Sequence, residues 1–273
     1  MLKQRIITAF ILIPLVVWGV LGLPSLWLAF LFAPFVFIGA WEWSRLIPLN
    51  SHSARLCYLL LMLLLLMAVG YFMQNSLIST GFPMLASLFW ALSIFWLGAV
   101  HIGRETSAKW VMIKSLLGLL ILSSCWLSVL LIHAMPANGP SLLLTLLIVI
   151  WATDSGAYFS GRQWGRHKLA PQVSPKKTWE GFWGGCFSGL LVALVSATIL
   201  GWENERLLQF VLLALFVIIA SVIGDLFESL LKRHQNIKDS GNIFPGHGGV
   251  LDRIDSLTAA APVYLLGLYW IGA

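Results

Sequence analysis

Long apolar segments follow one another along most of this chain, and they limit its fold more than any other feature. Each is about as long as a membrane span, and they cover 6–23, 26–43, 56–73, 82–100, 115–133, 141–161, 182–200, 207–224 and 257–272. With 59% hydrophobic and 10% charged residues, a soluble domain could not cover so much apolar surface. Inside hydrocarbon each segment must be helical, because no water is present to satisfy the backbone. The sequence therefore predicts an all-α, polytopic integral membrane protein with about nine spans in a single domain, 1–273.

The Lys and Arg residues predict how these spans are oriented. If the amino terminus is cytoplasmic, all of the 17 Lys and Arg residues except Arg206 fall on the cytoplasmic side, as the positive-inside rule requires. We therefore expect the amino terminus in the cytoplasm and the carboxyl terminus on the opposite side. Two cytoplasmic loops, 162–180 and 225–255, are more elaborate than orientation requires. Residues 1–140 are accordingly interpreted as a helical scaffold, and 141–273 as the part with the catalytic helices and loops.

Charged residues are concentrated in one segment of the second half, 225–255. It holds five of the 11 acidic residues: Asp225, Glu228, Asp239, Asp252 and Asp255. From Asp225 polar residues recur at helical spacing, so the eighth span is expected to continue as an amphipathic helix that also carries Ser229, Lys232 and Arg233. Pairing of Glu228 with Lys232 on a solvated helix end explains the outer part of this stripe. It does not explain Asp225, because a carboxylate directly after an apolar run costs about 3 kcal/mol; Asp225 is expected to face a cavity or a partner.

The segment after this helix has features of a phosphate-binding loop. It contains a base and an acid and then a glycine-rich turn: Lys238, Asp239, Gly246, His247, Gly248 and Gly249. Glycines let a backbone approach a ligand closely, although most glycine-rich turns only reverse the chain. Asp252 and Asp255, with Arg253 between them, begin the ninth span, and carboxylates beside bases suit Mg²⁺ with bound phosphates. His247 has no second His nearby, which favours a hydrogen bond within the loop over a role as ligand or base.

The other elaborate loop offers a further acid and further cations. Asp154 lies within the sixth span, near its cytoplasmic end, and is either a polar tie between helices or part of the site. Lys176 and Lys177 are either positive-inside anchors or the groups that neutralise a nucleotide triphosphate at the membrane surface.

The residues from Ser229 to Asp255 follow the pattern SxLKRx4KDxGx2FPxHGGVxDRxD. This pattern resembles the signature of the phosphatidate cytidylyltransferases, or CDP-diacylglycerol synthases, and the segments around Asp154 and 174–181 are similar to a second conserved region of that family. The resemblance implies an enzyme that converts CTP and phosphatidate to CDP-diacylglycerol and pyrophosphate and requires Mg²⁺. It further implies a dimer in the bacterial inner membrane or a eukaryotic membrane, a polar cavity open to the cytoplasm, and a metal at Asp225 and Asp252.

The hypothesis that follows is in-line nucleotidyl transfer, in which positioning and charge neutralisation do most of the catalysis. Asp225 and Asp252 are expected to hold Mg²⁺, with Asp255 and Asp239 beside them. Phosphates are expected to contact Lys232, Arg233, Lys238, Arg253, Lys176 and Lys177. Ser229 is expected to supply a hydroxyl contact, since no base partner marks it as a nucleophile. The expected partners are CTP, phosphatidate, the bilayer and a second copy of the chain; no nucleic acid is expected, and a monovalent cation beside Mg²⁺ stays open.

Two other classes of protein share some of these features. An ion-coupled transporter also carries intramembrane acids such as Asp154 and Asp225, but repeats or broken helices at matching positions are typical of that class and are not evident here. A CDP-alcohol phosphotransferase acts on the product lipid. The acidic pattern associated with that family, which begins Asp-Gly and ends in two spaced Asp residues, is not found in this sequence.

Overall fold

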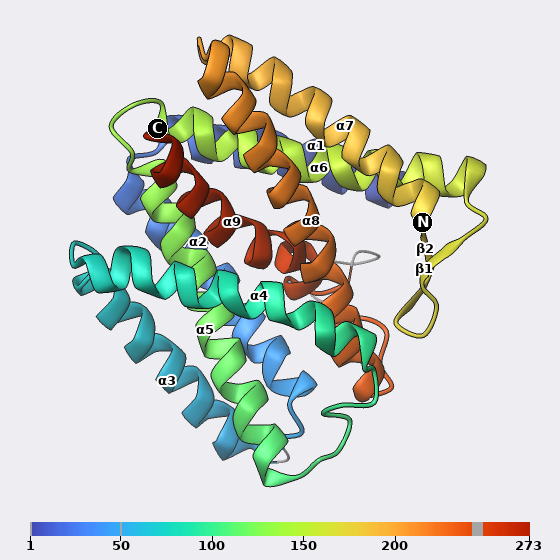
Figure 1. Cartoon of the computed structure of the whole chain (residues 1–273). Coiled ribbons are helices and arrows are strands. Elements are labelled where there is room, and N and C mark those ends of the chain that lie inside the picture. The colour runs from blue at the N-terminus through green and yellow to red at the C-terminus, as the bar shows by residue number, and fades with distance from the viewer. Residues whose placement is uncertain (1, 50, 242–247) are drawn as a thin grey trace.

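Within the residues that it describes, 2–49, 51–241 and 248–273, the computed structural model is a bundle of nine α-helices (Figure 1). The helices are α1 (Leu2–Gly22, with side chains described from Leu12), α2 (Ser25–Leu46), α3 (His52–Tyr71), α4 (Phe82–Gly98), α5 (Ala108–His133), α6 (Gly139–Trp164), α7 (Trp179–Ile199), α8 (Asn204–His234) and α9 (Leu251–Ile271). A π-helical turn, η1 (Leu77–Gly81), leads into α4. A short hairpin of β1 (Lys168–Ala170) and β2 (Ser174–Thr178) joins α6 to α7. The predicted all-α class with about nine helices is confirmed.

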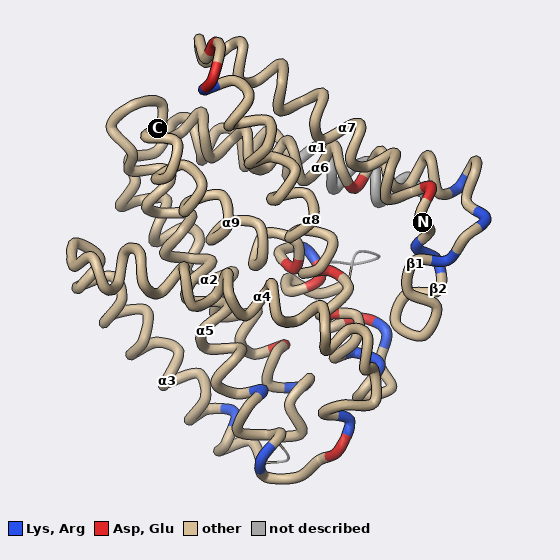
Figure 2. The backbone as a smooth tube through the Cα atoms, in the orientation of Figure 1, with Lys and Arg blue, Asp and Glu red and all other residues tan. Residues whose placement is uncertain are grey.

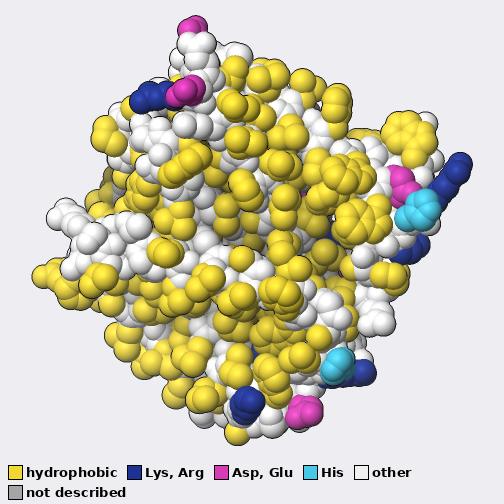
Figure 3. Space-filling view, viewed as in Figure 1, with side chains coloured by type: hydrophobic (Ala, Val, Ile, Leu, Met, Phe, Trp, Pro, Cys, Tyr) yellow, Lys and Arg dark blue, Asp and Glu magenta, His cyan; other side chains and the backbone are white. Residues whose placement is uncertain are grey.

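Most of these helices are suited to a bilayer. Eight of them, α2 to α9, are long and apolar enough to cross a membrane, with α4 counted together with η1. The part of α1 with described side chains, Leu12–Gly22, is apolar but shorter. Figure 3 shows hydrophobic side chains over most of the visible surface, with charged groups near its edges. Such an extensive exposed apolar surface matches contact with lipid.

Helix α8 confirms one prediction about its length, and α5 corrects another. The eighth helix continues through Asp225 to His234, as its polar spacing indicated. Helix α5 begins at Ala108 rather than near residue 115, so it includes Lys109 and Lys114. No Gly or Pro interrupts 108–117, so the helix starts before the strongly apolar run does. Lys114 is buried there, with 1% of its surface exposed.

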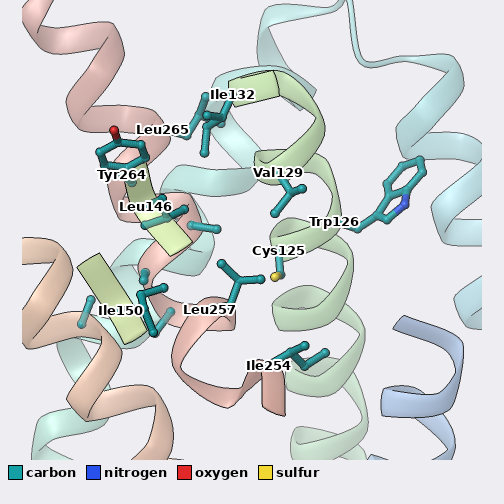
Figure 4. Close-up of a cluster of buried hydrophobic side chains, with 14 of the residues drawn as sticks. Cys125, Trp126, Val129, Ile132, Leu146, Ile150, Ile254, Leu257, Tyr264 and Leu265 are labelled. Atoms are coloured by element: carbon teal, nitrogen blue, oxygen red, sulfur yellow. The ribbon is translucent and has the colours of Figure 1, made fainter. Parts of the chain in front are cut away.

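The centre of the bundle is formed by α5, α6 and α9 (Figure 4). The side chains that meet there include Cys125, Val129, Leu146, Ile150, Leu257 and Leu265. All six are buried, and α9 lies far from α5 and α6 in the sequence. This packing ties the first half of the chain to α9, which carries Asp252 and Asp255 at its start.

Helices α6 and α7 run side by side at short range (Figure 1). Three glycines of α7, Gly181, Gly185 and Gly189, recur every four residues and face α6. A Cβ on Gly185 would lie 2.8 Å from the backbone oxygen of Thr153, and a Cβ on Gly181 would lie 2.8 Å from that of Ala157. Small residues at this spacing let helix backbones approach within a membrane. The close packing holds both ends of the β1–β2 hairpin.

We expect Gly185→Ala to lower the free energy of unfolding by about 1–3 kcal/mol, the usual cost of overpacking. The new methyl group meets a backbone carbonyl, which cannot rotate away as a side chain can. Gly98→Ala is the matched control, because a Cβ at Gly98 meets no atom within 4 Å. The thermal midpoints of both variants in detergent measure the difference, and equal midpoints would contradict the close packing.

The β1–β2 hairpin is docked on α8. Its Val173 is 2% exposed and packs against Leu226 and Leu230 of α8. Arg233 of α8 donates from Nε to the carbonyl oxygen of Val173 at 3.2 Å. The loop predicted at 162–180 therefore contains a hairpin with a fixed place beside the polar face of α8.

Candidate active site

Helices α8 and α9 approach closely at Gly224, and this contact brings their acidic residues together. A Cβ on Gly224 would lie 2.6 Å from the backbone oxygen of Asp255, so the glycine permits the approach. Figure 2 shows acidic and basic positions gathered beside α8, in a chain that is otherwise mostly uncharged. The polar residues that the two helices contribute are Asp225, Glu228, Ser229, Lys232, Asp252 and Asp255. We refer to these six residues as the α8–α9 cluster.

Lys232 joins the two helices through ion pairs. Its Nζ lies 2.6 Å from Oδ1 of Asp252 on α9 and 3.2 Å from Oε2 of Glu228, one turn earlier on α8. The side chains of Lys232 and Asp252 are each only 9% exposed, and that of Glu228 is 3% exposed. Charges so far removed from water depend on one another, and removal of one partner leaves another uncompensated. Lys232 therefore holds the cluster together electrostatically.

Asp225 connects the cluster to the hairpin. Its Oδ2 lies 2.6 Å from Nζ of Lys177 on β2, and its Oδ1 accepts a long hydrogen bond of 3.4 Å from the Ser229 hydroxyl. Neighbouring residues of a strand point to opposite faces, so Lys176 is directed away from this contact and is exposed. Of the two predicted nucleotide-binding lysines, the structure therefore brings Lys177 to the cluster.

The two ends of the glycine-rich segment, residues 240–249, meet at Asp252. Its Oδ2 accepts hydrogen bonds from the backbone N–H groups of Ser240, at 3.0 Å, and Gly249, at 2.8 Å. Gly248 has a φ of +78°, and a Cβ there would collide with the Asp252 carboxylate. Gly248 thus lets the backbone close around an acid of the protein, whereas the composition was interpreted as close approach to a ligand. Gly246 and His247 lie outside the described residues.

Arg233, whose predicted phosphate contact stays a prediction, makes structural contacts here. Besides its bond to Val173, it donates to the carbonyl oxygen of Ile237 at 3.4 Å. These bonds fix the hairpin and the end of α8. Lys238 and Asp239 are exposed on the segment that follows α8.

Two other predicted residues, Asp154 and Arg253, lie close enough to the cluster to interact with its charges. Asp154 is exposed on α6, and the charges that act on it are those of Asp225, Lys177 and Arg253. Arg253 is exposed in the first turn of α9. The charge of Asp225 also acts on Asp255, whose Oδ1 accepts a hydrogen bond from the N–H of Ser256 at 2.7 Å. The two elaborate loops therefore converge on one region, as predicted.

Two acids of this region were absent from the predicted site. Glu228 was interpreted as half of an exposed helix pair, yet it is buried against Lys232. Glu42 of α2 was not singled out, although its carboxylate accepts three hydrogen bonds from residues of the glycine-rich segment and the start of α9. A signal for Glu42 was available, because it is the only acid among residues 1–104 and lies in an apolar segment.

The carboxylates of this region can be compared with the ligands that Mg²⁺ requires. In 2–49, 51–241 and 248–273, no group of three or more His, Cys, Asp or Glu residues is placed to hold a metal ion. Mg²⁺ usually takes only one or two carboxylates and completes its shell with phosphate and water oxygens. Both carboxylates already contact protein groups, but the side chain of Asp225 is 30% exposed and that of Asp252 only 9%, so Asp225 is the more accessible to an ion and its phosphate ligands. The residues fit a magnesium–phosphate site that includes Asp225.

Comparison with known proteins places this chain in a family. A sequence model of the Cytidylyltransferase family matches residues 3–270. The phosphatidate cytidylyltransferase of Pseudomonas aeruginosa is 40% identical over 274 residues, an alignment that covers 100% of this chain and 98% of the relative. That of Haemophilus influenzae is 36% identical and covers 97% of each chain. That of Bacillus subtilis is 50% identical over 127 residues, 45% of this chain. The resemblance seen in the residues from Ser229 to Asp255 is confirmed, and the chain belongs to the cytidylyltransferase family.

Proposed function

We propose that this chain is the membrane enzyme that transfers CMP from CTP to phosphatidate, giving CDP-diacylglycerol and pyrophosphate. The observation that carries the proposal is the buried Lys232–Asp252 pair, set beside the Lys177–Asp225 pair at the contact of α8 and α9. Lysines paired with carboxylates can transfer their hydrogen bonds to phosphate oxygens when a nucleotide arrives. Relatives that match over nearly their whole length are named phosphatidate cytidylyltransferases, which supports this reading of the site.

The reaction needs one bond to form and one to break at the α-phosphorus of CTP. A phosphate oxygen of phosphatidate attacks this phosphorus, and the bond to the oxygen that bridges the α- and β-phosphorus breaks. Pyrophosphate leaves with that electron pair. The attacking phosphate is already anionic at neutral pH, so a strong general base is not required. Lys177 and Lys232 would hold phosphate oxygens in place, and catalysis would come mainly from positioning and charge neutralisation.

Mg²⁺ belongs to this proposal as a cofactor. Asp225 would hold it, together with Asp252 or Asp255 from the start of α9. When bound, the ion would neutralise charge on the phosphates of the nucleotide and the lipid. The protein's own part is to keep Asp225 partly exposed and to keep Asp252 oriented by Lys232 and two backbone N–H groups.

We also propose that the cluster faces the cytoplasm, with the amino terminus on that side and the carboxyl terminus opposite. Lys232 and Arg206 lie near opposite ends of α8, and Arg206 is the one base that the positive-inside count left outside. Because the relatives that match over nearly the whole chain come from Pseudomonas aeruginosa and Haemophilus influenzae, the bacterial inner membrane is the proposed location. A homodimer is proposed from the family resemblance.

Labelled CTP tests the reaction. Purified protein in mixed micelles is incubated with phosphatidate, Mg²⁺ and CTP that carries ³²P at either the α- or the γ-position. We expect label in the lipid extract only from α-labelled CTP, and only when phosphatidate is present, because CMP alone is transferred.

Three results would contradict the proposal. They are lipid label from γ-labelled CTP, lipid label without phosphatidate, and no lipid label under any of these conditions. A CDP-alcohol phosphotransferase would leave the lipid extract unlabelled, because it releases CMP from CDP-diacylglycerol and does not use CTP.

A further inference from the structure

Glu42 is a buried carboxylate of α2 that the proposed reaction does not use directly. Only 1% of its surface is exposed. A buried charge is unfavourable unless strong hydrogen-bond partners replace the water that it loses. Glu42 has such partners, and all of them lie about 200 residues away in the sequence.

The hydrogen-bond partners of Glu42 lie at the two ends of the glycine-rich segment. Oε2 accepts hydrogen bonds from the Ser240 hydroxyl at 2.9 Å and from the N–H of Leu251 at 2.7 Å, and Oε1 accepts from the N–H of Val250 at 3.1 Å. Val250 and Leu251 begin α9, where backbone N–H groups have no partner within the helix. A carboxylate there also faces the positive end of the helix dipole. Glu42 therefore caps α9 from another helix.

Two glycines of the family-like pattern make room for this carboxylate. A Cβ on Gly241 would overlap Oε1 of Glu42, and a Cβ on Gly249 would overlap both of its oxygens and the Ser240 hydroxyl. Gly241 and Gly249 thus allow the backbone to close around a protein carboxylate. This contact accounts for two glycines that composition alone attributes to ligand binding.

The contacts of Glu42 lead directly to the site. Ser240 donates its hydroxyl to Glu42 and its backbone N–H to Oδ2 of Asp252. Leu251, which donates to Glu42, is the neighbour of Asp252 in the chain. The other oxygen of Asp252 contacts Lys232. A shift of Glu42 would therefore move both the N–H donors and the backbone that orient Asp252.

We propose that Glu42 is a positioning residue: it holds Ser240 and the start of α9 so that Asp252 faces Lys232 in the geometry needed for CMP transfer. The catalytic consequence rests on the proposed function, whereas the capping contact itself does not. Loss of groups that orient a metal ligand usually lowers activity about 10- to 100-fold. We expect a decrease of that size in kcat for Glu42→Gln, because its amide presents an NH₂ group to donors that need an acceptor. The KM for CTP is expected to change little.

Two measurements on the full-length protein test this proposal. Hydrogen–deuterium exchange of the peptide that contains Val250 and Leu251 reports on capping, and the kcat for CMP transfer reports on positioning. Ser240→Ala removes one of the three bonds to Glu42, so it should raise exchange and lower kcat less than Glu42→Gln does. Ser44→Ala is the control, because its buried hydroxyl donates only to Trp41 within α2; both readouts should stay at the wild-type level.

The outcomes distinguish the capping of α9 by Glu42 from the effect of Glu42 on catalysis. Faster exchange and lower kcat in Glu42→Gln, with Ser44→Ala unchanged, is the expected result. Unchanged exchange would overturn the capping role, and faster exchange with undiminished kcat would overturn the link to catalysis. If Glu42→Gln does not fold, the same two comparisons on Ser240→Ala decide. An inactive wild type with faster exchange in Glu42→Gln would reject the proposed function while supporting the cap.

Discussion

Asp252→Asn is expected to lower the kcat for CMP transfer by about 10²- to 10³-fold, the loss typical of removing one preorganised polar contact from an active site. The substitution ends the 2.6 Å ion pair with Lys232 and places an amide against two backbone donors that need an acceptor. Lys232 keeps Glu228 at 3.2 Å, so we expect the variant to fold. Steady-state rates at saturating CTP and phosphatidate, together with the thermal midpoint, measure the two effects.

A double variant tests whether Asp252 and Lys232 act as one unit. Contacting residues of one ion-pair network have non-additive effects. Asp252→Asn combined with Lys232→Met should therefore be little worse than the more damaging single variant. Glu203→Gln, in the exposed turn before α8, controls for the loss of one negative charge. Fully multiplicative losses, or an Asp252→Asn enzyme as active as the wild type, would contradict the role given to this pair.

Lys177→Met is expected to lower kcat about 10²-fold, the size of effect that misplacement of a reacting group produces. Lys177 lies 2.6 Å from Asp225 and is the cation that β2 directs to the α8–α9 cluster. Lys176→Met is the matched control, since it removes the same charge from the neighbouring, outward-facing position. An exposed charge contributes about 0–1 kcal/mol, so Lys176→Met should change kcat less than about fivefold. The same assay on both variants checks this, and equal losses would indicate a general effect of loop charge.

Much of the fold could be predicted from the sequence, because few backbone structures are stable in hydrocarbon. Apolar segments of span length have to be helices there, and the nine predicted segments correspond to the nine helices found among the described residues. Helix ends were less predictable. Helix α5 begins at Ala108, before Lys114, because no Gly or Pro in 108–117 interrupts a helix. The β1–β2 hairpin was missed because its stability comes from Val173 packing on α8, a contact that no local pattern reports.

The site was predictable where its residues are neighbours on one helix. The spacing from Asp225 to Lys232 placed these side chains on one face of α8, and the structure pairs Lys232 with Asp252 on α9. Long-range partners were not predictable in this way. Glu42 contacts Leu251, which lies 209 positions later in the sequence. A single acid in an apolar helix forms no repeating pattern, so the sequence does not indicate which residues it contacts. The contacts of Arg233 with the carbonyl oxygens of Val173 and Ile237 were likewise not predicted, and its phosphate contact stays a prediction.

Isotope exchange between labelled pyrophosphate and CTP tests the central claim most directly, because it follows the proposed reaction in reverse. If CMP passes directly between the lipid phosphate and pyrophosphate on this chain, label should enter CTP only when CDP-diacylglycerol is present. The wild-type protein is measured with and without that lipid, at fixed Mg²⁺. Exchange that depends on CDP-diacylglycerol is the predicted result. Exchange without the lipid would indicate a CMP-enzyme intermediate, and no exchange with it would indicate a different reaction; either would contradict direct transfer at the α8–α9 cluster.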